Sequence, residues 1–345
     1  MPSAKSFFTV ALCTYLITIV FAFGFFPQLM RVHEKNAEQQ PTAASTSLAV
    51  QTITKEKSIC EMTQNELQQQ TYLRRIWQFW DGEHVNGYME LCHELMLAKS
   101  PTIFVDTIDS ECIKRVFPDA PSDFDLLIPA HKADYARCRL LTRFGGMYND
   151  YDTIALQSFQ PLFDKLDEEH SDIVRHRNGK DVMSPMSNLG PMKPNLPGIS
   201  SCKDIFHRMM KQRVNEKIGD KLVWPMCSPT ILRPLAALLE QAPNGVIKFS
   251  DLQPFDEKTM QGSYIFLGTD AEKQRRIAKY ILEKGNFEGT TNQYLVVLNN
   301  YYNEEFGKLS REEAYCEKHN PISIILRSQM QRAELETPGC SKARR

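Results

Sequence analysis

The chain has 345 residues, of which 42% are hydrophobic and 10% aromatic, enough to bury the core of one large domain. Its 41 Lys and Arg residues nearly balance its 42 Asp and Glu residues, so the formal net charge is −1. This balance argues against a broad basic surface for a nucleic-acid backbone or an anionic membrane, and we expect no nucleic-acid partner.

The first segment predicts a membrane anchor. Residues 1–6 are a short tail, and residues 7–30 contain no Asp, Glu, Lys or Arg. About 20 apolar residues suffice to cross a bilayer as a helix, so this run predicts an N-terminal transmembrane helix. A cleaved signal peptide is the alternative, because Ala22 and Gly24 follow the apolar core at a spacing typical of cleavage. The run continues through Met30, which favours the uncleaved anchor, and either reading sends the chain into the secretory pathway.

The flanking charges leave the orientation of this anchor open, since Lys5 precedes it and Arg31 follows it. Residues 31–70 are rich in Gln, Ala, Ser, Thr and Glu and predict a stem, which places the folded domain at residues 71–345. Eight of the nine cysteines follow the apolar run, an even number that suits an oxidising compartment, although their pairing cannot be deduced from sequence.

The start of the expected domain predicts alternating strands and helices. Residues 75–80 form an aromatic and β-branched run that ends at Asp81-Gly82, as a buried strand followed by a turn would. A helical stretch follows at residues 88–98, and a second strand is expected at residues 102–106. Strand, helix and strand in this order favour the α/β class.

Residues 130–144 predict an amphipathic helix, because Ala133, Ala136, Leu140 and Phe144 fall on one narrow stripe. Gly145 and Gly146 follow directly, where a helix terminator is expected. Asp134 and Arg137 lie three residues apart on neighbouring flanks of the same stripe, within reach of one another.

The segment after the glycines contains an Asp-x-Asp motif. If residues 147–152 are extended, Tyr148, Asp150 and Asp152 share one face, because side chains alternate along a strand. Two carboxylates held together repel unless a cation neutralises them, and carboxylate oxygens suit Mg²⁺ or Mn²⁺. Such ions are completed by substrate phosphates, which a nucleotide diphosphate supplies. An isolated Asp-x-Asp is more often a solvated strand end.

The compound pattern is more specific than the pair of aspartates. It runs Asp134-x-x-Arg137, seven residues, then Gly145-Gly146-x-Tyr148-x-Asp150-x-Asp152. Together with residues 75–80, it resembles the Asp-x-Asp glycosyltransferases of family 32, including capsular polysaccharide synthesis and Och1-type sugar transferases. It is also similar to the catalytic core of the large clostridial glucosylating toxins. The resemblance covers residues 75–160, a minority of the chain.

This resemblance implies a Rossmann-like nucleotide-sugar transferase fold of the GT-A type. It implies that Trp80 stacks on the donor base and that Asp134 and Arg137 contact the donor sugar. Gly146 and Tyr148 would lie at the nucleotide sugar, and Asp150 and Asp152 would bind ribose and metal. Each residue has a structural alternative: Trp80 and Tyr148 as core aromatics, Arg137 as an ion-pair partner of Asp134, and the glycines as helix terminators.

The expected function is transfer of a hexose, with retention of configuration, from a nucleotide sugar to a glycan, glycolipid or glycoprotein, with Mn²⁺ or Mg²⁺ as cofactor. The expected location is the Golgi or endoplasmic reticulum membrane, as a single-pass type II protein with a lumenal catalytic domain. Two alternatives stay open: a non-catalytic relative that binds glycans or partners, and an anchored protein that faces the cytosol. The C-terminal half departs from the family, because no counterpart of a closing loop with a late histidine or tryptophan is evident after residue 268.

Overall fold

The computed structural model describes residues 56–82, 85–178, 181–183, 191–196, 204, 207–208, 249–252, 264–267, 270–284, 293–298 and 304–340. They belong to one compact unit that extends from Thr54 to Arg345. The expected tail, the expected anchor at residues 7–30 and the first part of the expected stem lie outside the described residues. In the portion described, no helix combines the length and apolarity that a membrane span requires.

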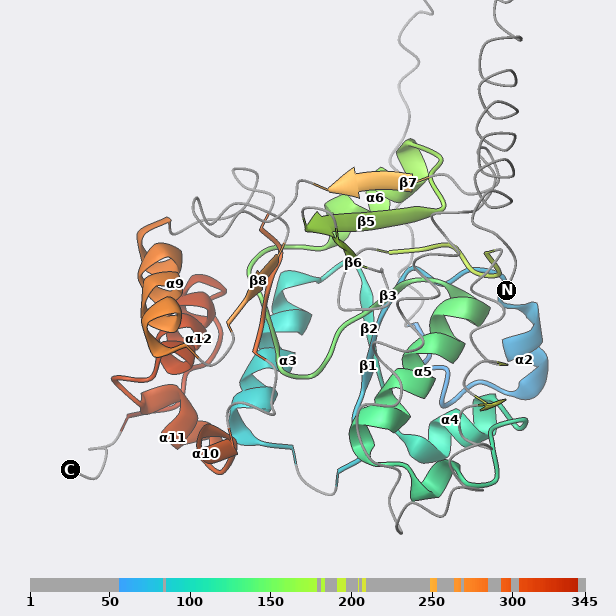
Figure 1. The fold of residues 1–345 in the computed structure, drawn as a ribbon, viewed down its shortest axis with the longest axis horizontal. Coiled ribbons are helices and arrows are strands. Elements are labelled where there is room, and N and C mark those ends of the chain that lie inside the picture. The colour runs from blue at the N-terminus through green and yellow to red at the C-terminus, as the bar shows by residue number, and fades with distance from the viewer. Residues whose placement is uncertain are drawn as a thin grey trace, which may run out of the picture. The chain divides into compact units, whose positions relative to one another are not determined.

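Strands and helices alternate through the N-terminal half, and helices dominate the C-terminal end (Figure 1). In chain order the elements are α2 (Gln64–Gln69), β1 (Arg75–Phe79), α3 (Gly87–Lys99), β2 (Phe104–Ile108), α4 (Ser110–Val116), the 3-10 turn η1 (Phe124–Leu126), α5 (Pro129–Phe144), β3 (Met147–Tyr148), β4 (Thr153–Ala155), α6 (Gln160–Glu168), β5 (Ile173–Asn178), β6 (Asp181–Met183), β7 (Phe249–Leu252), β8 (Tyr264–Phe266), α9 (Ala271–Lys284), β9 (Leu295–Val297), α10 (Glu304–Gly307), α11 (Arg311–Cys316) and α12 (Pro321–Arg332).

The central sheet has the order β2-β1-β3, and both pairings are parallel. All five residues of β1 are buried, as expected for the middle strand of a parallel sheet covered on both faces. Two further three-stranded sheets have the orders β4-β9-β8 and β6-β5-β7. The predicted α/β class is confirmed, and the two predicted strands appear as β1 and β2, the second shifted toward Ile108.

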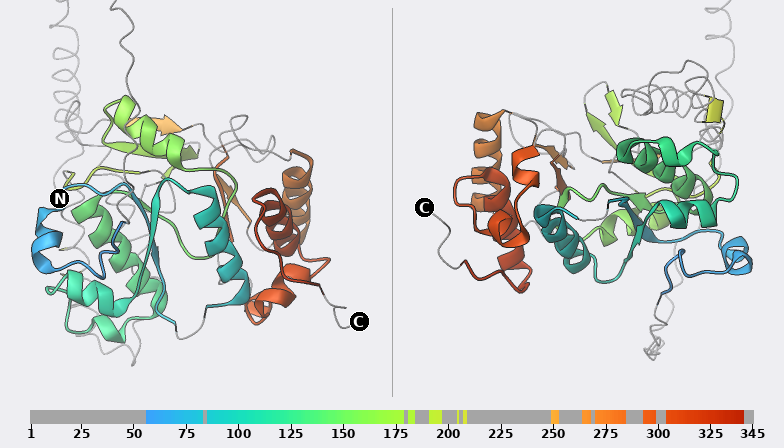
Figure 2. Two further views of the ribbon diagram at one scale, coloured as in Figure 1. Left: turned by 180° about the vertical axis from the view of Figure 1, so that it is seen from behind. Right: turned by 90° about the horizontal axis from the view of Figure 1, so that it is seen from below.

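The two faces of the central sheet carry different helices. Trp77 and Phe79 pack with α4 and α5, whereas Ile76 packs with Met96 of α3. Consecutive residues of a strand point to opposite faces, so α3 and α5 cover opposite faces of β1. The C-terminal helices share a hydrophobic cluster with α3, and Figures 1 and 2 show them stacked on α3, on the side away from α5.

Helix α3 and the C-terminal helices fit together at close range. A Cβ atom on Gly87 would lie 2.1 Å from the backbone nitrogen of Arg311, so no larger residue fits where α3 begins. Arg311 also pairs with Glu94 of α3, with Nη2 2.7 Å from a carboxylate oxygen. The C-terminal helices are therefore held on α3 by both backbone contact and charge.

Helix α5 confirms the predicted amphipathic helix, which begins at Pro129 and ends at Phe144. Gly145 and Gly146 have φ values of 68° and 86°, a region that L-residues with side chains rarely adopt. The indole Nε1 of Trp77 donates a 2.7 Å hydrogen bond to the carbonyl of Gly145. The predicted glycine terminator is confirmed, and the central strand fixes its position.

The end of the expected stem is part of the folded unit. Asp106 of β2 accepts hydrogen bonds from Ser58 Oγ at 2.6 Å and from the backbone nitrogen of Ile59 at 3.0 Å. A disulfide joins Cys60 to Cys112 of α4. Residues 56–70 thus differ from a stem that would end at residue 70, because a few apolar side chains within this polar stretch bury themselves against the domain: Ile59, Met62 and Leu67.

The cysteines follow the expectation of an oxidising compartment only in part. Cys60–Cys112 and Cys316–Cys340 are disulfides, and Cys138 is also disulfide-bonded. Cys92 of α3 is a free, buried thiol. The even number of cysteines therefore does not mean that all of them pair.

A buried ion pair at the start of β1 yields a prediction about stability. Arg75 Nη1 lies 2.7 Å from Asp106 Oδ2, with side-chain exposures of 3% and 1%. Asp106→Asn would leave the charge of Arg75 buried without its partner, so this substitution should lower the free energy of unfolding by about 3 to 5 kcal/mol. Glu66→Gln removes the exposed pair between Glu66 and Lys57 and should cost under about 1 kcal/mol. Denaturant unfolding of both variants measures the contrast, and equal small losses would show that Asp106 does not anchor residues 56–60.

Candidate active site at the carboxyl ends of the parallel strands

The predicted site residues gather where the parallel strands end. Trp80 and Asp81 follow β1, Asp109 follows β2, and Asp150 comes two residues after β3. The order β2-β1-β3 means that the connections leave β1 toward opposite sides. In open α/β sheets, ligands bind in the crevice outside the carboxyl ends of the strands at such a point. The topology thus makes this edge the first place to look for a ligand site.

Arg137 of α5 lies at the centre of a buried cluster at this edge. Its Nη2 lies 2.8 Å from Asp150 Oδ1, and its Nη1 lies 3.6 Å from Asp134 Oδ1. Its guanidinium carbon lies 4.4 Å from the centre of the Tyr148 ring. The structure therefore brings together four of the predicted residues, from α5, from β3 and from the turn after β3.

The cluster contains more hydrogen-bonding capacity than its own members use. Among the described residues, Asp134 Oδ2 and Arg137 Nε are buried and have no hydrogen-bond partner. Buried polar atoms are nearly always paired, because an unpaired one loses its hydration without compensation. Other buried atoms, such as Arg75 Nε, are unpaired as well, so the position at the strand ends, together with the missing partners, makes Asp134 Oδ2 and Arg137 Nε candidates for contact with a polar ligand.

Burial also perturbs the ionisation of these groups. Burial raises the pKa of Asp134 to about 6, with the charge of Asp150 adding to the rise and that of Arg137 opposing it. Burial likewise raises the pKa of Tyr148 far above its usual value, and the nearby Asp150 contributes. Strongly perturbed carboxyl groups in a cleft are typical of functional sites.

The two aspartates of the motif do not share a strand face, so that prediction is wrong. Strand β3 ends at Tyr148, and residues 149–152 form a turn before β4. The turn is required because β4 leaves the central sheet and pairs with β9. Asp150 meets α5 through Arg137, whereas Asp152 lies near α3, where its charge contributes to raising the pKa values of Tyr88 and Cys92.

This arrangement bears on how a metal would be held. Two carboxylates in one turn are oxygen ligands of the kind that Mg²⁺ and Mn²⁺ prefer. Within the described residues, no group of three or more His, Cys, Asp or Glu side chains is placed to hold an ion. Asp150 is paired with Arg137 and Asp152 lies near α3, so the described residues show two carboxylates in one turn but no assembled metal site.

Trp80 lies on the α3 side of the same edge and packs with the C-terminal cluster. Its ring centre lies 5.8 Å from that of Tyr151, and its Nε1 is buried with no hydrogen-bond partner among the described residues. Trp80 and the Arg137 cluster are thus on different sides of the strand ends, with the turn at residues 149–152 between them.

Gly146 occupies a packed position rather than an open one. A Cβ atom there would lie 2.7 Å from the carbonyl oxygen of Arg75 and 2.9 Å from the indole nitrogen of Trp77. The close approach of β3 to β1 therefore accounts for Gly146, as helix termination accounts for Gly145. The structure does not bring Gly146 to the other predicted ligand-binding residues.

Sequence reasoning missed a second ion pair at this edge. Lys132 Nζ of α5 lies 2.5 Å from Asp81 Oδ2, and Asp81 Oδ1 accepts a hydrogen bond from the backbone nitrogen of Ser110. Burial tends to raise the pKa of Asp81, but these two hydrogen bonds outweigh it and the pKa lies below its usual value. The only signal in the sequence was position, since Asp81 follows Trp80 and Lys132 precedes Asp134 by two residues.

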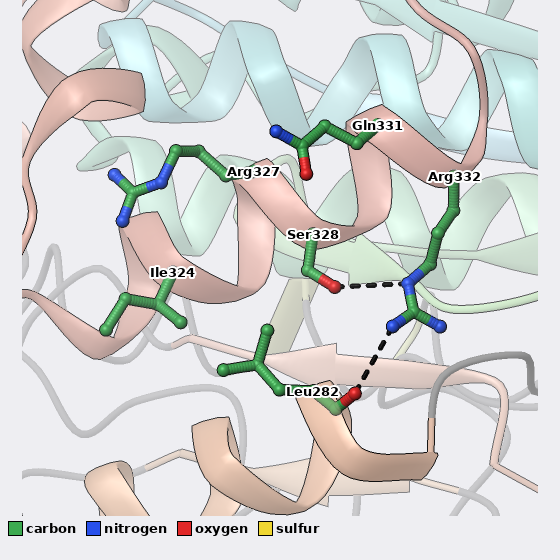
Figure 3. Close-up of a pocket in the computed structure, with 6 residues that line it drawn as sticks. All are labelled: Leu282, Ile324, Arg327, Ser328, Gln331 and Arg332. Carbon is green, nitrogen blue, oxygen red and sulfur yellow. Dashed lines mark hydrogen bonds between the residues drawn. The ribbon is translucent and has the colours of Figure 1, made fainter.

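A groove of about 440 Å³ lies elsewhere, between α9 and α12 (Figure 3). Arg332 donates to the carbonyl of Leu282 at the end of α9, and Arg327 donates to the carbonyl of Tyr315 in α11. Both arginines therefore satisfy carbonyl groups at helix ends, which is a structural role. None of the motif residues lines this groove.

A family model covers the part of the chain that contains the cluster. Residues 49–171 match the family model described as "Glycosyltransferase sugar-binding region containing DXD motif". That region includes Trp80, the Arg137 cluster and Asp152. The chain also matches the solved structure "PaToxG Glycosyltransferase" at 13% identity over 76% of this chain and 88% of that one, but the TM-score of 0.32 is too low to establish a common fold. No curated protein matches the chain. The family match supports a glycosyltransferase.

Proposed function

We propose that this protein is a metal-dependent, retaining glycosyltransferase of the family 32 type, with a GT-A fold. It moves a hexose from a nucleotide sugar to a glycan, glycolipid or glycoprotein. The observation that carries the proposal is the Arg137 cluster, with its buried and unpaired polar atoms, inside the region that matches the glycosyltransferase family model.

Each residue of the cluster has a different role in binding the donor. The unpaired Asp134 Oδ2 accepts a hydrogen bond from a sugar hydroxyl, and Arg137 Nε donates one to a sugar or phosphate oxygen. Asp150 keeps the Arg137 guanidinium in a fixed orientation. A rigid set of donors and charges lowers the barrier because little reorganisation accompanies the reaction.

Asp150 and Asp152 would hold Mn²⁺ or Mg²⁺, which when bound neutralises the charge that develops on the departing diphosphate. Trp80 stands at the same edge, and its buried indole Nε1 has no hydrogen-bond partner among the described residues, which supports a contact between Trp80 and the nucleobase. Retention of configuration is what the resemblance to the family 32 glycosyltransferases implies.

We also propose that the protein is a single-pass type II protein of the Golgi or endoplasmic reticulum with a lumenal catalytic domain, anchored by residues 7–30. The support comes from that uncharged run and from the disulfides Cys60–Cys112 and Cys316–Cys340, because disulfides persist in oxidising compartments. Protease protection in sealed vesicles tests the lumenal location.

The central test is donor turnover. The full chain with Mn²⁺ should release nucleoside diphosphate from at least one member of a panel of nucleotide sugars, and Asp152→Asn should abolish this release. Because Asp152 is buried, removing its charge should leave metal-free stability unchanged or slightly raised. Calorimetric titration with Mn²⁺ and thermal melts measure binding and stability. Equal stabilisation of wild type and Asp152→Asn by Mn²⁺ would contradict the metal assignment, and nucleotide binding without turnover would indicate a non-catalytic relative.

Arg137→Lys should lower donor use by about a hundredfold, because an ammonium cannot replace the planar guanidinium between Asp134 and Asp150. Folding should stay nearly intact. Arg143→Lys is the matched control on the same helix, since Arg143 donates only to backbone carbonyls of Leu67, Gln68 and Gln70. The control should lose thermal stability and keep turnover per folded molecule; the reverse pattern would make Arg137 the structural residue.

The raised pKa of Asp134 predicts a pH-dependent cost in stability. The native pKa of about 6 exceeds the ordinary value of 3.8, so between these values the native state binds more protons than the unfolded state. The contribution is favourable below about pH 3.8 and is lost as the pH rises to about 6, a change of about 3 kcal/mol. Relative to wild type, metal-free Asp134→Asn should therefore become more stable from pH 4 to pH 7. If the difference in the free energy of unfolding between Asp134→Asn and wild type stays constant from pH 4 to pH 7, the assignment is contradicted.

A further inference from the structure

Tyr151 occupies the middle of the Asp-x-Asp turn, and its ring packs against two other rings. Its ring stacks on His93 of α3, with centroids 5.1 Å apart and planes inclined by 14°. On another side, the Trp80 ring lies 5.8 Å away at an angle of 46°. One side chain thus contacts both the helix beneath the turn and the tryptophan at the end of β1.

His93 is itself fixed by the central strand. Its Nδ1 lies 2.6 Å from Gln78 Oε1 of β1, within hydrogen-bond distance of the central strand. Burial lowers the pKa of His93, with the charge of Glu94 opposing the shift, so the neutral ring is favoured. A neutral ring stacks on tyrosine without the cost of a buried charge.

The backbone of the turn is tied at its two ends. The nitrogen of Asn149 donates to the carbonyl of Trp77 at 3.0 Å, and the carbonyl of Asp152 accepts from the nitrogen of Leu298 at 3.3 Å. Between these ties, the side-chain contacts of Asp150 and Tyr151 face opposite ways, the first to α5 and the second to α3. The hydroxyl of Tyr151 adds only a weak 3.4 Å contact to Thr107.

From this geometry we propose that Tyr151 and His93 are positioning residues of the donor site: the stacked pair holds the turn so that Asp150, Asp152 and Trp80 keep one relative arrangement. This inference rests on the proposed function for what the arrangement binds. A residue between two carboxylates controls the directions of both, since a rotation of its backbone moves its neighbours. The hydrogen bond between His93 and Gln78 fixes the orientation of the His93 ring.

The alternative is that Tyr151 is an ordinary core aromatic, because its side chain is buried in the C-terminal cluster. The two interpretations predict different effects when the ring of Tyr151 is removed. Loss of a core aromatic lowers stability everywhere, whereas loss of a positioning ring also loosens residues 149–153 and weakens the ligand. Phe117 is the matched control: it packs on Phe144 with centroids 6.1 Å apart and belongs to the hydrophobic cluster with α4 and α5, whereas Tyr151 belongs to the cluster with α3.

The experiment uses the full chain with Tyr151→Leu, Tyr151→Phe, His93→Ala, His93→Phe and the control Phe117→Leu. Tyr151→Leu and Phe117→Leu should lower the melting temperature by similar amounts. Only Tyr151→Leu and His93→Ala should speed amide hydrogen exchange at residues 149–153 and weaken Mn²⁺ with uridine or guanosine diphosphate by about 10- to 100-fold, as loss of a supporting residue does. Tyr151→Phe and His93→Phe keep a stacking ring and should stay close to wild type.

The readouts separate this inference from the proposed function. If wild type binds neither diphosphate with Mn²⁺, the proposed function fails, while hydrogen exchange still tests whether the pair holds the turn. If Tyr151→Leu changes exchange at residues 149–153 and diphosphate affinity no more than Phe117→Leu does, the positioning role is overturned. If the phenylalanine variants behave like Tyr151→Leu and His93→Ala, stacking is not the source of the effect and the inference fails as well.

Discussion

The rest of the structure depends on the parallel pairing of β1 with strands on both of its sides. A strand in this position must be covered on both faces, and α3 and α5 cover them. The same pairing brings the carboxyl ends of β1, β2 and β3 to one edge. Helix α5 runs back from that edge to the start of β3, so its N-terminal half places Asp134 and Arg137 beside the turn that carries Asp150.

Two buried arginines show how the same chemistry serves stability in one place and ligand binding in another. Arg75 and Asp106 lie within a network in which Ser58 and Ile59 occupy the carboxylate oxygens of Asp106. Arg137 and Asp134 keep unpaired atoms and a longer contact of 3.6 Å between them. The Arg75 network closes the domain onto residues 56–60, with both carboxylate oxygens of Asp106 hydrogen-bonded. Arg75 Nε and Arg137 Nε both have no hydrogen-bond partner among the described residues, so what distinguishes the Arg137 cluster is the unpaired Asp134 Oδ2 and its position at the strand ends.

The turn at residues 149–152 joins the two faces of the sheet. Asp150 reaches α5, whereas Tyr151 and Asp152 reach α3, and through α3 the turn contacts the C-terminal helices. The C-terminal half therefore supports the site even though its sequence shows no closing-loop counterpart. Close packing at Gly87 and the ion pair between Glu94 and Arg311 make α3 a rigid base for that support.

The sequence by itself determined the α/β class and helix α5 with its glycine terminator, because these features follow from local periodicity and short spacings. The grouping of Asp134, Arg137, Tyr148 and Asp150 was implied by the resemblance to family 32 rather than by spacing. Only the tertiary structure decided that Asp152 faces α3, that Trp80 and the Arg137 cluster lie on different sides of the edge, and that residues 56–70 belong to the folded unit. The physical reason is that these outcomes depend on partners far along the chain: β4 turns away because it pairs with β9, and Asp106 is buried because Ser58 and Ile59 cover it.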